Sequence, residues 1–224
     1  GTGDTIARVV AEDLAKTLKA SIIVDNKAGA NGNIGAANAA QAAPDGYRLL
    51  FSWAGTLAVN PNLYQKLSFD PIKDFEPIGL IADVPNILVI NKDLPPKTLD
   101  EFIAYAKKSP GRFSYGSAGN GSAGHLAFEY LKMTADLFLL HVPYRGTGPM
   151  MTDLLSGRLE ASAVGAAAML PFIKSGKVRC IATGSAKRLP QLPDVPTVAE
   201  QGFPGFEMTQ WYGMLAPANM PAAN

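Results

Sequence analysis

The stretch Phe113-Ser-Tyr-Gly-Ser-Ala-Gly-Asn-Gly-Ser-Ala-Gly-His-Leu-Ala-Phe-Glu-Tyr-Leu131 indicates the fold class of this chain. A β-prone run, residues 112–115, enters a loop of small residues, and the loop opens into a helical pattern with Leu126 and Tyr130 on one stripe. Ser122 is the expected N-cap, because its hydroxyl can accept from a free N–H group of the first turn. A helix start gathers unpaired N–H groups and a partial positive charge, which suits a carboxylate or phosphate. We interpret this loop as half of an anion-binding cleft.

The same loop allows two other interpretations. Residues 119–124 match G-x-G-x-x-G, the dinucleotide fingerprint, which needs an acidic residue at the end of the next strand, roughly twenty residues on. Asp136 comes too early for that role, and the end of the next apolar run offers His141 and no carboxylate. A nucleotide cofactor is therefore not expected. A purely structural loop that only reverses the chain stays open as the alternative.

Composition limits the classes of function. A chain of 224 residues with 47% hydrophobic and 17% charged residues is an ordinary globular chain of one large or two small domains. Its net charge of +1 and lack of a basic run do not indicate a nucleic-acid partner. The longest apolar runs, such as residues 161–173, are interrupted and too short to span a bilayer. One cysteine, Cys180, and two histidines support neither a disulfide nor a metal site, so no metal is expected.

The first third of the chain alternates helices and strands. A loop with Asp4 as the expected N-cap leads into a helix, and an α/β pattern of this kind predicts a parallel sheet. Such a unit should begin with a strand, whereas this chain begins inside the loop that would follow one. The expected elements are a helix over 6–19, a strand over 21–24, a glycine-rich loop over 26–35, an alanine-rich helix through 43 and a buried strand over 47–52.

A second series of elements predicts a second lobe. Strands are expected over 75–84 and 86–91, on either side of Pro85, and Thr98 caps a new helix with Glu101 completing a capping box. We place lobe 1 at residues 1–97 plus about 208–224, and lobe 2 at residues 98–207. The elements expected after Thr98 are helices over 99–107, 124–133, 150–155 and 197–201, strands over 113–115, 137–142, 159–164 and 178–183, and a β-prone run over 206–215.

Reactive side chains are sparse at the expected loops. His125 falls on a first helical turn, where the helix dipole disfavours its charge, so a neutral hydrogen-bonding or packing role is preferred to that of a catalytic base. Asp4 is interpreted as a helix cap rather than a catalytic carboxylate. Arg145 is either a solvated loop side chain or an anion partner, and both interpretations stay open. Binding is thus favoured over catalysis, since small residues fill five strand-to-helix loops: 2–3, 53–56, 117–122, 144–148 and 165–167.

A series of motifs resembles a known family, the Bug/TctC receptors of tripartite tricarboxylate transporters. The resemblance covers nearly the whole chain and is specific in order and spacing. Its motifs are Asn26-Lys-Ala-Gly-Ala-Asn-Gly-Asn-Ile-Gly35, Ala43-Pro-Asp-Gly-Tyr47, Asn60-Pro-Asn-Leu-Tyr64, Asp70-Pro-Ile-Lys-Asp-Phe75, Tyr115-Gly-Ser-Ala-Gly-Asn-Gly121, His141-Val-Pro-Tyr-Arg-Gly146 and Leu192-Pro-Asp-Val-Pro-Thr-Val-Ala-Glu200.

The resemblance implies an α/β fold of the type II periplasmic-binding-protein kind, with two lobes around a ligand cleft and hinge closure on a carboxylate. It also implies a periplasmic monomer that needs no cofactor and works with membrane transporter subunits. Similar proteins carry a signal peptide and one strand before the position of Gly1, and a segment after Asn224. We therefore expect this sequence to be trimmed at both ends.

The family's ligand loops carry over position by position. The expected ligand-binding residues are Thr2, Gly3, Asp4, Trp53, Gly55, Thr56, Ser117, Gly119, Asn120, Ser122, His125, Tyr144, Arg145 and Gly165.

Two departures from the family pattern concern the distal end of the pocket. The family often has a polar residue before Gly55, where this chain has Trp53-Ala54, and an Asp-Asn pair where this chain has Val164-Gly165. A more apolar pocket is expected, with Trp53 able to stack on a flat ligand. We hypothesise a monocarboxylate, aromatic acids included, in preference to an amino acid or citrate. The alternative of a different class is a hydrolase or transferase that uses the same cleft with His125 as base.

Overall fold

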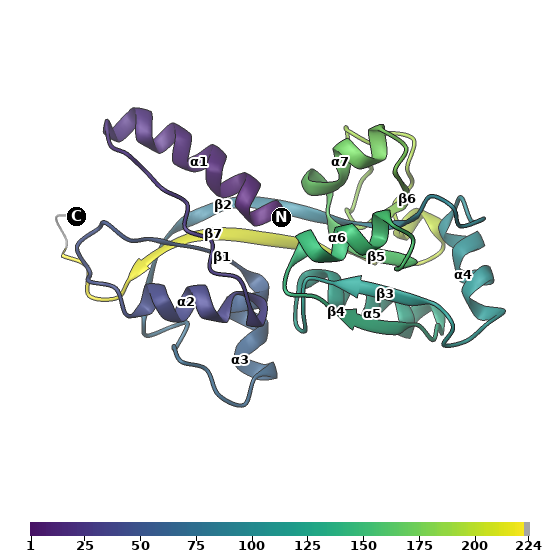
Figure 1. Ribbon diagram of the computed structural model, residues 1–224, viewed down its shortest axis with the longest axis horizontal. Helices are drawn as coiled ribbons and strands as arrows, with labels where there is room; N and C mark the ends of the chain where they lie inside the picture. Colours follow the sequence, from purple (N-terminus) through teal and green to yellow (C-terminus); the bar gives the residue numbers. More distant parts are fainter. Residues whose placement is uncertain (222–224) are drawn as a thin grey trace. The chain divides into compact units, whose positions relative to one another are not determined.

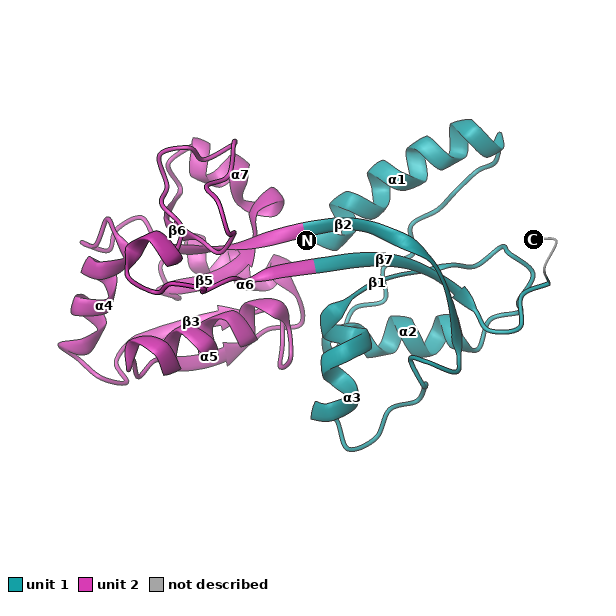
Figure 2. Cartoon of the chain, turned by 180° about the vertical axis from the view of Figure 1, so that it is seen from behind, with its two compact units in different colours: residues 1–83, 211–224 teal, residues 84–210 magenta. Residues whose placement is uncertain are grey.

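The computed structural model describes residues 1–221, and contacts within the chain divide it into two compact units. Unit 1 comprises residues 1–83 and 211–224, and unit 2 comprises residues 84–210 (Figure 2). Residues 222–224, at the end of the predicted lobe 1, lie outside the described residues. Each unit boundary falls within a strand, whereas the sequence analysis placed the lobe changes near residues 97 and 208.

Unit 1 holds helices and a small sheet whose strands come from distant parts of the chain. In that sheet β7 lies between β1 and β2, and β1 pairs with β7 antiparallel, with Trp53 opposite Tyr212. In chain order the elements are α1 (Thr2–Leu18), the 3-10 turn η1 (Ala30–Gly32), α2 (Asn33–Ala40), β1 (Leu50–Trp53), the π-helical turn η2 (Gly55–Val59), α3 (Asn60–Leu63), the first part of β2 (Phe75–Asn91) and most of β7 (Thr209–Pro217) (Figure 1).

The core of unit 1 packs α2 against the sheet. Alanines on α2 let its backbone approach β1 closely, and Phe69 meets Phe75 edge to face at 6.0 Å between ring centroids. On α1 the amphipathic pattern is only partly covered, since Val9 and Leu18 are 66% and 63% exposed. The buried cluster is formed by Ala36, Ala39, Leu50, Phe69, Phe75 and Leu215.

Unit 2 is an α/β unit with one five-stranded sheet. The sheet order is β6–β2–β5–β3–β4, in which β5, β3 and β4 run parallel and β2 runs antiparallel to both β5 and β6. Its elements are the rest of β2, α4 (Leu99–Lys107), β3 (Ser114–Ser117), α5 (Ala123–Ala135), β4 (Leu140–Pro143), α6 (Thr147–Leu155), β5 (Ala161–Gly165), α7 (Ala166–Lys174), β6 (Val178–Thr183) and the 3-10 turn η3 (Ala199–Gln201).

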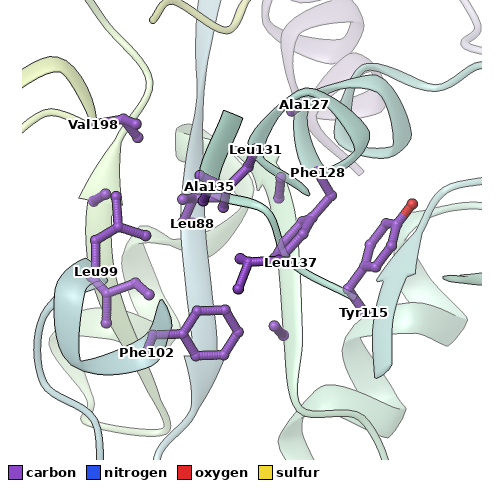
Figure 3. Packing of buried hydrophobic residues seen from close by; sticks show 14 of the residues in the cluster. Leu88, Leu99, Phe102, Tyr115, Ala127, Phe128, Leu131, Ala135, Leu137 and Val198 are labelled. Atoms are coloured by element: carbon purple, nitrogen blue, oxygen red, sulfur yellow. The ribbon is translucent and has the colours of Figure 1, made fainter. Parts of the chain in front are cut away.

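Both faces of this sheet are covered, as the unbroken apolar run of β2 requires. Leu88 and Ile90 point into one buried cluster, whereas Ile87 and Val89 point into the other. Alternate residues of a strand face opposite sides, so a strand covered on both sides reads as a continuous apolar run. Figure 3 shows the first cluster, in which α4, α5, β2, β3 and the segment at Val198 contribute packed side chains.

Four structural expectations from the sequence are corrected. Residues 75–91 form one strand rather than two, because Pro85 precedes the first residue that pairs with β5 and so removes no ladder hydrogen bond there. Residues 21–24 are not a strand, since among the described residues no strand pairs with them. The sheets are not purely parallel: β1 pairs antiparallel to β7, and β2 antiparallel to its neighbours. Asp4 is not an N-cap, because α1 begins at Thr2 with Gly1 as its N-cap.

Candidate functional site

Three helices of unit 2 begin at one edge of its sheet. Strands β3, β4 and β5 are parallel, so their carboxyl ends share an edge, and α5, α6 and α7 follow them in turn. The first N–H groups of each helix lack partners within the helix and carry its positive dipole end. This edge of unit 2 can therefore receive an anion by main-chain groups, as the sequence analysis expected for the loops at residues 117–122, 144–148 and 165–167.

The loop between β3 and α5 is fixed by its own hydrogen bonds. The Ser122 hydroxyl accepts from His125 N at 3.4 Å, which confirms the predicted N-cap. The Ser117 hydroxyl donates to Gly119 O at 3.1 Å and accepts from Gly119 N at 3.1 Å. Gly121 N donates to His125 Nδ1 at 3.1 Å. The N–H groups of Gly119 and Gly121 are thus engaged inside the loop.

His141 lies on β4 and contacts the start of this loop. It was not among the expected ligand-binding residues. Its Nε2 is 2.7 Å from Ser117 Oγ, and its ring stacks on His125 at 4.2 Å between centroids. On the other side it stacks on Tyr115 at 4.9 Å. His141 belongs to the quoted motif at residues 141–146, but only the parallel pairing of β3 with β4 places it beside Tyr115.

The electrostatics of this cluster favour neutral histidines. Burial and, after it, the neighbouring His125 lower the pKa of His141 to about 4. Burial likewise lowers the pKa of His125, against the opposing effect of Glu129. Burial raises the pKa of Tyr115, whose hydroxyl donates to Glu129 Oε1 at 2.5 Å. Burial alone would raise the pKa of Glu129, but hydrogen bonds from Lys132 and Tyr115 outweigh it and leave this pKa lowered.

The remaining expected residues of unit 2 lie on the same strand-to-helix loops. Tyr144 N donates to Ser117 O at 3.0 Å and its hydroxyl donates to Asp153 at 2.8 Å, so it connects the first two loops with α6. The side chains of Asn120 and Arg145 are exposed. Gly165 ends β5 and is the N-cap of α7.

In unit 1 the expected residues gather around Trp53. A Cβ added to Gly3 would lie 4.0 Å from the indole and one added to Gly55 would lie 3.1 Å from it. Tyr212 of β7 approaches the same ring at 6.2 Å between centroids. Gly32, which was not among the expected residues, also packs against this ring, since a Cβ added to it would lie 3.0 Å from the indole. Sequence reasoning placed Gly32 in a glycine-rich loop but gave no signal that the loop reaches β1.

Buried amides hold that loop in place. Thr56 Oγ1 donates to Asn31 O at 2.8 Å, and Asn60 Nδ2 donates to Asn33 Oδ1 at 2.6 Å. Asn31 Nδ2 in turn donates to Asn60 Oδ1 at 3.0 Å. Asn60 is fully buried, so each of these bonds satisfies a group that would be costly to bury unpaired. Thr56 was expected to touch ligand, and in this structure its hydroxyl is engaged with the loop.

The start of α1 holds a buried hydroxyl. Thr2 is 5% exposed, and within residues 1–221 its Oγ1 has no hydrogen-bond partner. Asp4, two residues further, is committed to unit 1: its Oδ1 accepts from Asn26 at 2.6 Å and it pairs with Arg8 at 3.0 Å. Hydrogen bonds from Arg8 and then Asn26 lower the pKa of Asp4.

Other candidate chemistry is absent from the part of the chain that the structure describes. Within residues 1–221 no group of three His, Cys, Asp or Glu side chains could hold a metal ion. Burial raises the pKa of the Cys180 thiol to about 12, which makes it a poor nucleophile. Each helix of the described chain is too short or too polar to cross a membrane.

Comparison with known proteins identifies the family. The model of the tripartite tricarboxylate transporter family receptor, TctC, matches residues 6–223. This chain belongs to the TctC family. Among similar proteins is BugT of Bordetella pertussis. It is 37% identical to this chain over 218 residues, which are 97% of this chain and 67% of BugT.

Solved structures of similar chains confirm the fold. R. palustris Rpa4515 with adipate is 36% identical, with a TM-score of 0.96 over 98% of this chain and 74% of that one. MatC (Rpa3494) from Rhodopseudomonas palustris with bound malate is 35% identical, with a TM-score of 0.91 over 98% of this chain and 74% of that one. The Bug/TctC resemblance and the α/β periplasmic-binding-protein fold class are both confirmed.

The chain spans 64% to 67% of the length of three curated relatives that it matches. The activity, ligands and partners of the whole protein are therefore matters of proposal.

Proposed function

We propose that this protein is an extracytoplasmic solute receptor that captures a small organic carboxylate and delivers it to a tripartite tricarboxylate-type transporter. The observation that carries the proposal is the shared edge of unit 2, where α5, α6 and α7 all begin, in a chain of the TctC family. Unpaired main-chain N–H groups at three helix starts bind a carboxylate without any reactive side chain. Adipate and malate, the ligands solved with two similar chains, belong to this class.

Each unit supplies its own set of groups. In unit 2 we assign carboxylate contacts to the first-turn N–H groups of α5 other than that of His125, with Asn120 and Arg145 as exposed polar groups on the adjoining loops. In unit 1 we assign Thr2, whose buried hydroxyl lacks a protein partner in the described residues, and the small residues around Trp53. Ser117, Ser122 and Thr56 hold the loops rather than the ligand, because their hydroxyls already have partners. Closure of two lobes on the ligand, which the resemblance implies, stays a prediction.

We further propose an aromatic acid as the preferred ligand. The support is Trp53, which stands where the family often has a polar residue and is partly exposed, with three glycines packed close to its indole. A periplasmic location and a monomeric state complete the proposal, in line with the family. Binding without catalysis is part of it: His125 Nδ1 accepts from Gly121 N, so this nitrogen is not available as a base.

A thermal-shift screen tests the proposal directly. The chain is heated with adipate, malate, benzoate and phenylacetate, and with the amide of each acid as a matched control that lacks the charge. A ligand at 100 times its Kd stabilises the folded state by about 2.7 kcal/mol, which shifts Tm by several degrees. Mass spectrometry of the recovered ligand then separates a receptor, which returns it unchanged, from a hydrolase or transferase. Equal shifts with acids and amides, or no shift at all, would contradict the carboxylate receptor.

A further inference from the structure

The two histidines of the chain lie together in one ring stack. Phe128 of α5 stacks on Tyr115 of β3 at 4.4 Å, Tyr115 on His141 of β4 at 4.9 Å, and His141 on His125 of α5 at 4.2 Å. The two contacts made by His141 are nearly parallel, with 20° and 22° between ring planes. Histidine is the side chain whose ordinary pKa lies between pH 5 and 8, and both histidines of the chain belong to this stack.

Both histidines hold the loop that precedes α5. His141 Nε2 is 2.7 Å from the Ser117 hydroxyl at the end of β3, and His125 Nδ1 accepts from Gly121 N at 3.1 Å. The two bonds therefore fix the first and last residues of the loop 117–121, and Ser117 and Gly121 are both buried. His125 can accept at Nδ1 only while that nitrogen carries no proton.

Protonation of the stack would oppose this arrangement. A proton on His125 Nδ1 would face the Gly121 N–H, placing two donors head to head. A charge on His141 would lie 4.2 Å from the His125 ring, and a second charge there would repel it. The charged groups that act on the pair are Glu129 and Lys132 of α5, which pair with each other at 2.7 Å, and Glu129 also accepts from the Tyr115 hydroxyl. Glu129 raises the pKa of both histidines and Lys132 lowers it, but burial outweighs Glu129 and leaves both rings favouring the neutral form.

We propose that His125 and His141 are positioning residues that hold the loop 117–121 ready for the ligand, and that protonation of the pair releases the loop and weakens carboxylate binding in acid. The proposal deepens the proposed function and rests on it for the ligand. The preferred neutral state of both rings agrees with their burial and with the lowered pKa of each. If the loop must become ordered on binding, affinity falls, because the conformational entropy lost by the loop makes the free energy of association less favourable.

Two variants separate the charge from the hydrogen bond. His125→Asn offers an acceptor at the position of Nδ1 without a titratable group, and His141→Gln offers an amide that can bond Ser117 at the position of Nε2 without one. His141→Phe keeps the stack and removes the bond to Ser117. We expect His141→Phe to weaken binding at every pH, and the two amide variants to lose the additional weakening in acid, each judged against its own Kd at pH 7.5.

The first measurement needs no ligand. In 15N-labelled protein, the amide signal of Gly121 is followed from pH 7.5 to 4.5 together with the His125 ring signals. We expect the two to titrate with one midpoint in the wild type and the Gly121 titration to vanish in His125→Asn. A Gly121 titration that persists unchanged in His125→Asn would overturn the proposal, whatever the ligand is.

The second measurement is the Kd for adipate by calorimetry over the same range. Dividing the wild-type Kd by that of His125→Asn at each pH removes the titration of adipate itself. We expect this ratio to rise about tenfold towards pH 4.5. A tenfold change corresponds to a one-unit difference between the pKa of His125 in the ligand-bound protein and its pKa in the free protein. A flat ratio, or tighter wild-type binding in acid, would overturn the proposal. If adipate, malate and benzoate bind no variant at any pH, the proposed function fails, while the amide titration still decides the role of the histidines.

Discussion

The hydroxyl of Thr56 donates to the carbonyl oxygen of Asn31 at 2.8 Å, joining the turn after β1 to a loop 25 residues earlier. Four successive residues of that loop, 29–32, have positive φ angles between 45° and 129°. Backbone of this kind is costly for residues other than glycine and persists only where neighbouring groups hold it. The packing around Trp53 therefore depends on contacts made by Thr56 and by Asn60.

Substitution of Gly32 by alanine should strongly destabilise unit 1. The added Cβ would collide with Thr56 Oγ1 and lie 3.0 Å from the Trp53 ring, at a φ of +89°. We expect a loss of about 3 kcal/mol, part from φ and part from overpacking. Gly46→Ala is the matched control, since its φ is +83° and its Cβ would meet only Met220 at 3.7 Å, so it should cost about 1 kcal/mol. Urea denaturation measures both, and equal losses would show that packing at Gly32 is unimportant.

Removal of the Asn60 amide should be costly for a different reason. Asn60 is fully buried and bonds the side chains of Asn31 and Asn33, so Asn60→Ala leaves several buried groups without partners. We expect a loss of about 2 to 3 kcal/mol in the free energy of unfolding. Asn62→Ala, two residues on, removes one exposed bond to Ala58 O and should change stability by less than about 0.5 kcal/mol. A small effect at Asn60 would mean that water replaces its partners.

The close approach of α5 to β5 makes Gly124 a sensitive position in unit 2. Its added Cβ would collide with the carbonyl oxygen of Ala163, so Gly124→Ala must push the helix away from the sheet. We expect about 2 kcal/mol of destabilisation and weaker ligand binding, because the start of α5 moves. In Gly148→Ala, at the start of α6, the Cβ would meet nothing within 4 Å. That variant should be neutral or slightly stabilising, as alanine favours helix. Comparable Tm values for both variants would contradict the packing argument.

Stability should fall as the solution is acidified below pH 6.5. The pKa of His141 is lowered to about 4 in the folded chain from an ordinary value of 6.5, so the unfolded chain binds the proton first. The stabilisation is complete above pH 6.5 and is lost as the pH falls towards 4. The carboxyls of Asp4 and Glu129, whose pKa values are also lowered, add their loss mainly below about pH 5. Urea midpoints between pH 5 and 7 should therefore decline in the wild type and decline less in His141→Gln, in which only His125, whose pKa is also lowered, still contributes. Parallel curves would count against a neutral His141.

Trp53 should set the choice of ligand. Trp53→Leu keeps an apolar side chain and removes the flat ring that we propose to stack on an aromatic acid. We expect the affinity for benzoate or phenylacetate to fall about tenfold while that for adipate changes less than threefold, since one aromatic contact contributes about 0.5 to 1.5 kcal/mol beyond burial. Trp211→Leu serves as the control for loss of a tryptophan elsewhere, being the second of the two in the chain. Equal losses for both acids would remove the aromatic preference.

The sequence by itself determined the α/β class, most element positions and the N-caps at Ser122 and Thr98. These features are local: a helix cap, an apolar stripe or a glycine turn depends on residues within one or two turns of chain. The strand at 178–183 and the helix at 99–107 match the expected bounds for the same reason. The order of motifs also indicated the TctC family, which the comparison confirms.

Tertiary structure decided strand direction and the partners of the site residues. Whether β2 lies antiparallel between β5 and β6 depends on pairing between segments far apart in sequence, which no local pattern encodes. The same is true of His141, which meets Ser117 and His125 only because β4 pairs with β3, and of Gly32, which meets Trp53 only through the buried amides of Asn31 and Asn60. Sequence specifies which groups a loop carries, whereas long-range packing determines which of those groups remain free to bind a ligand.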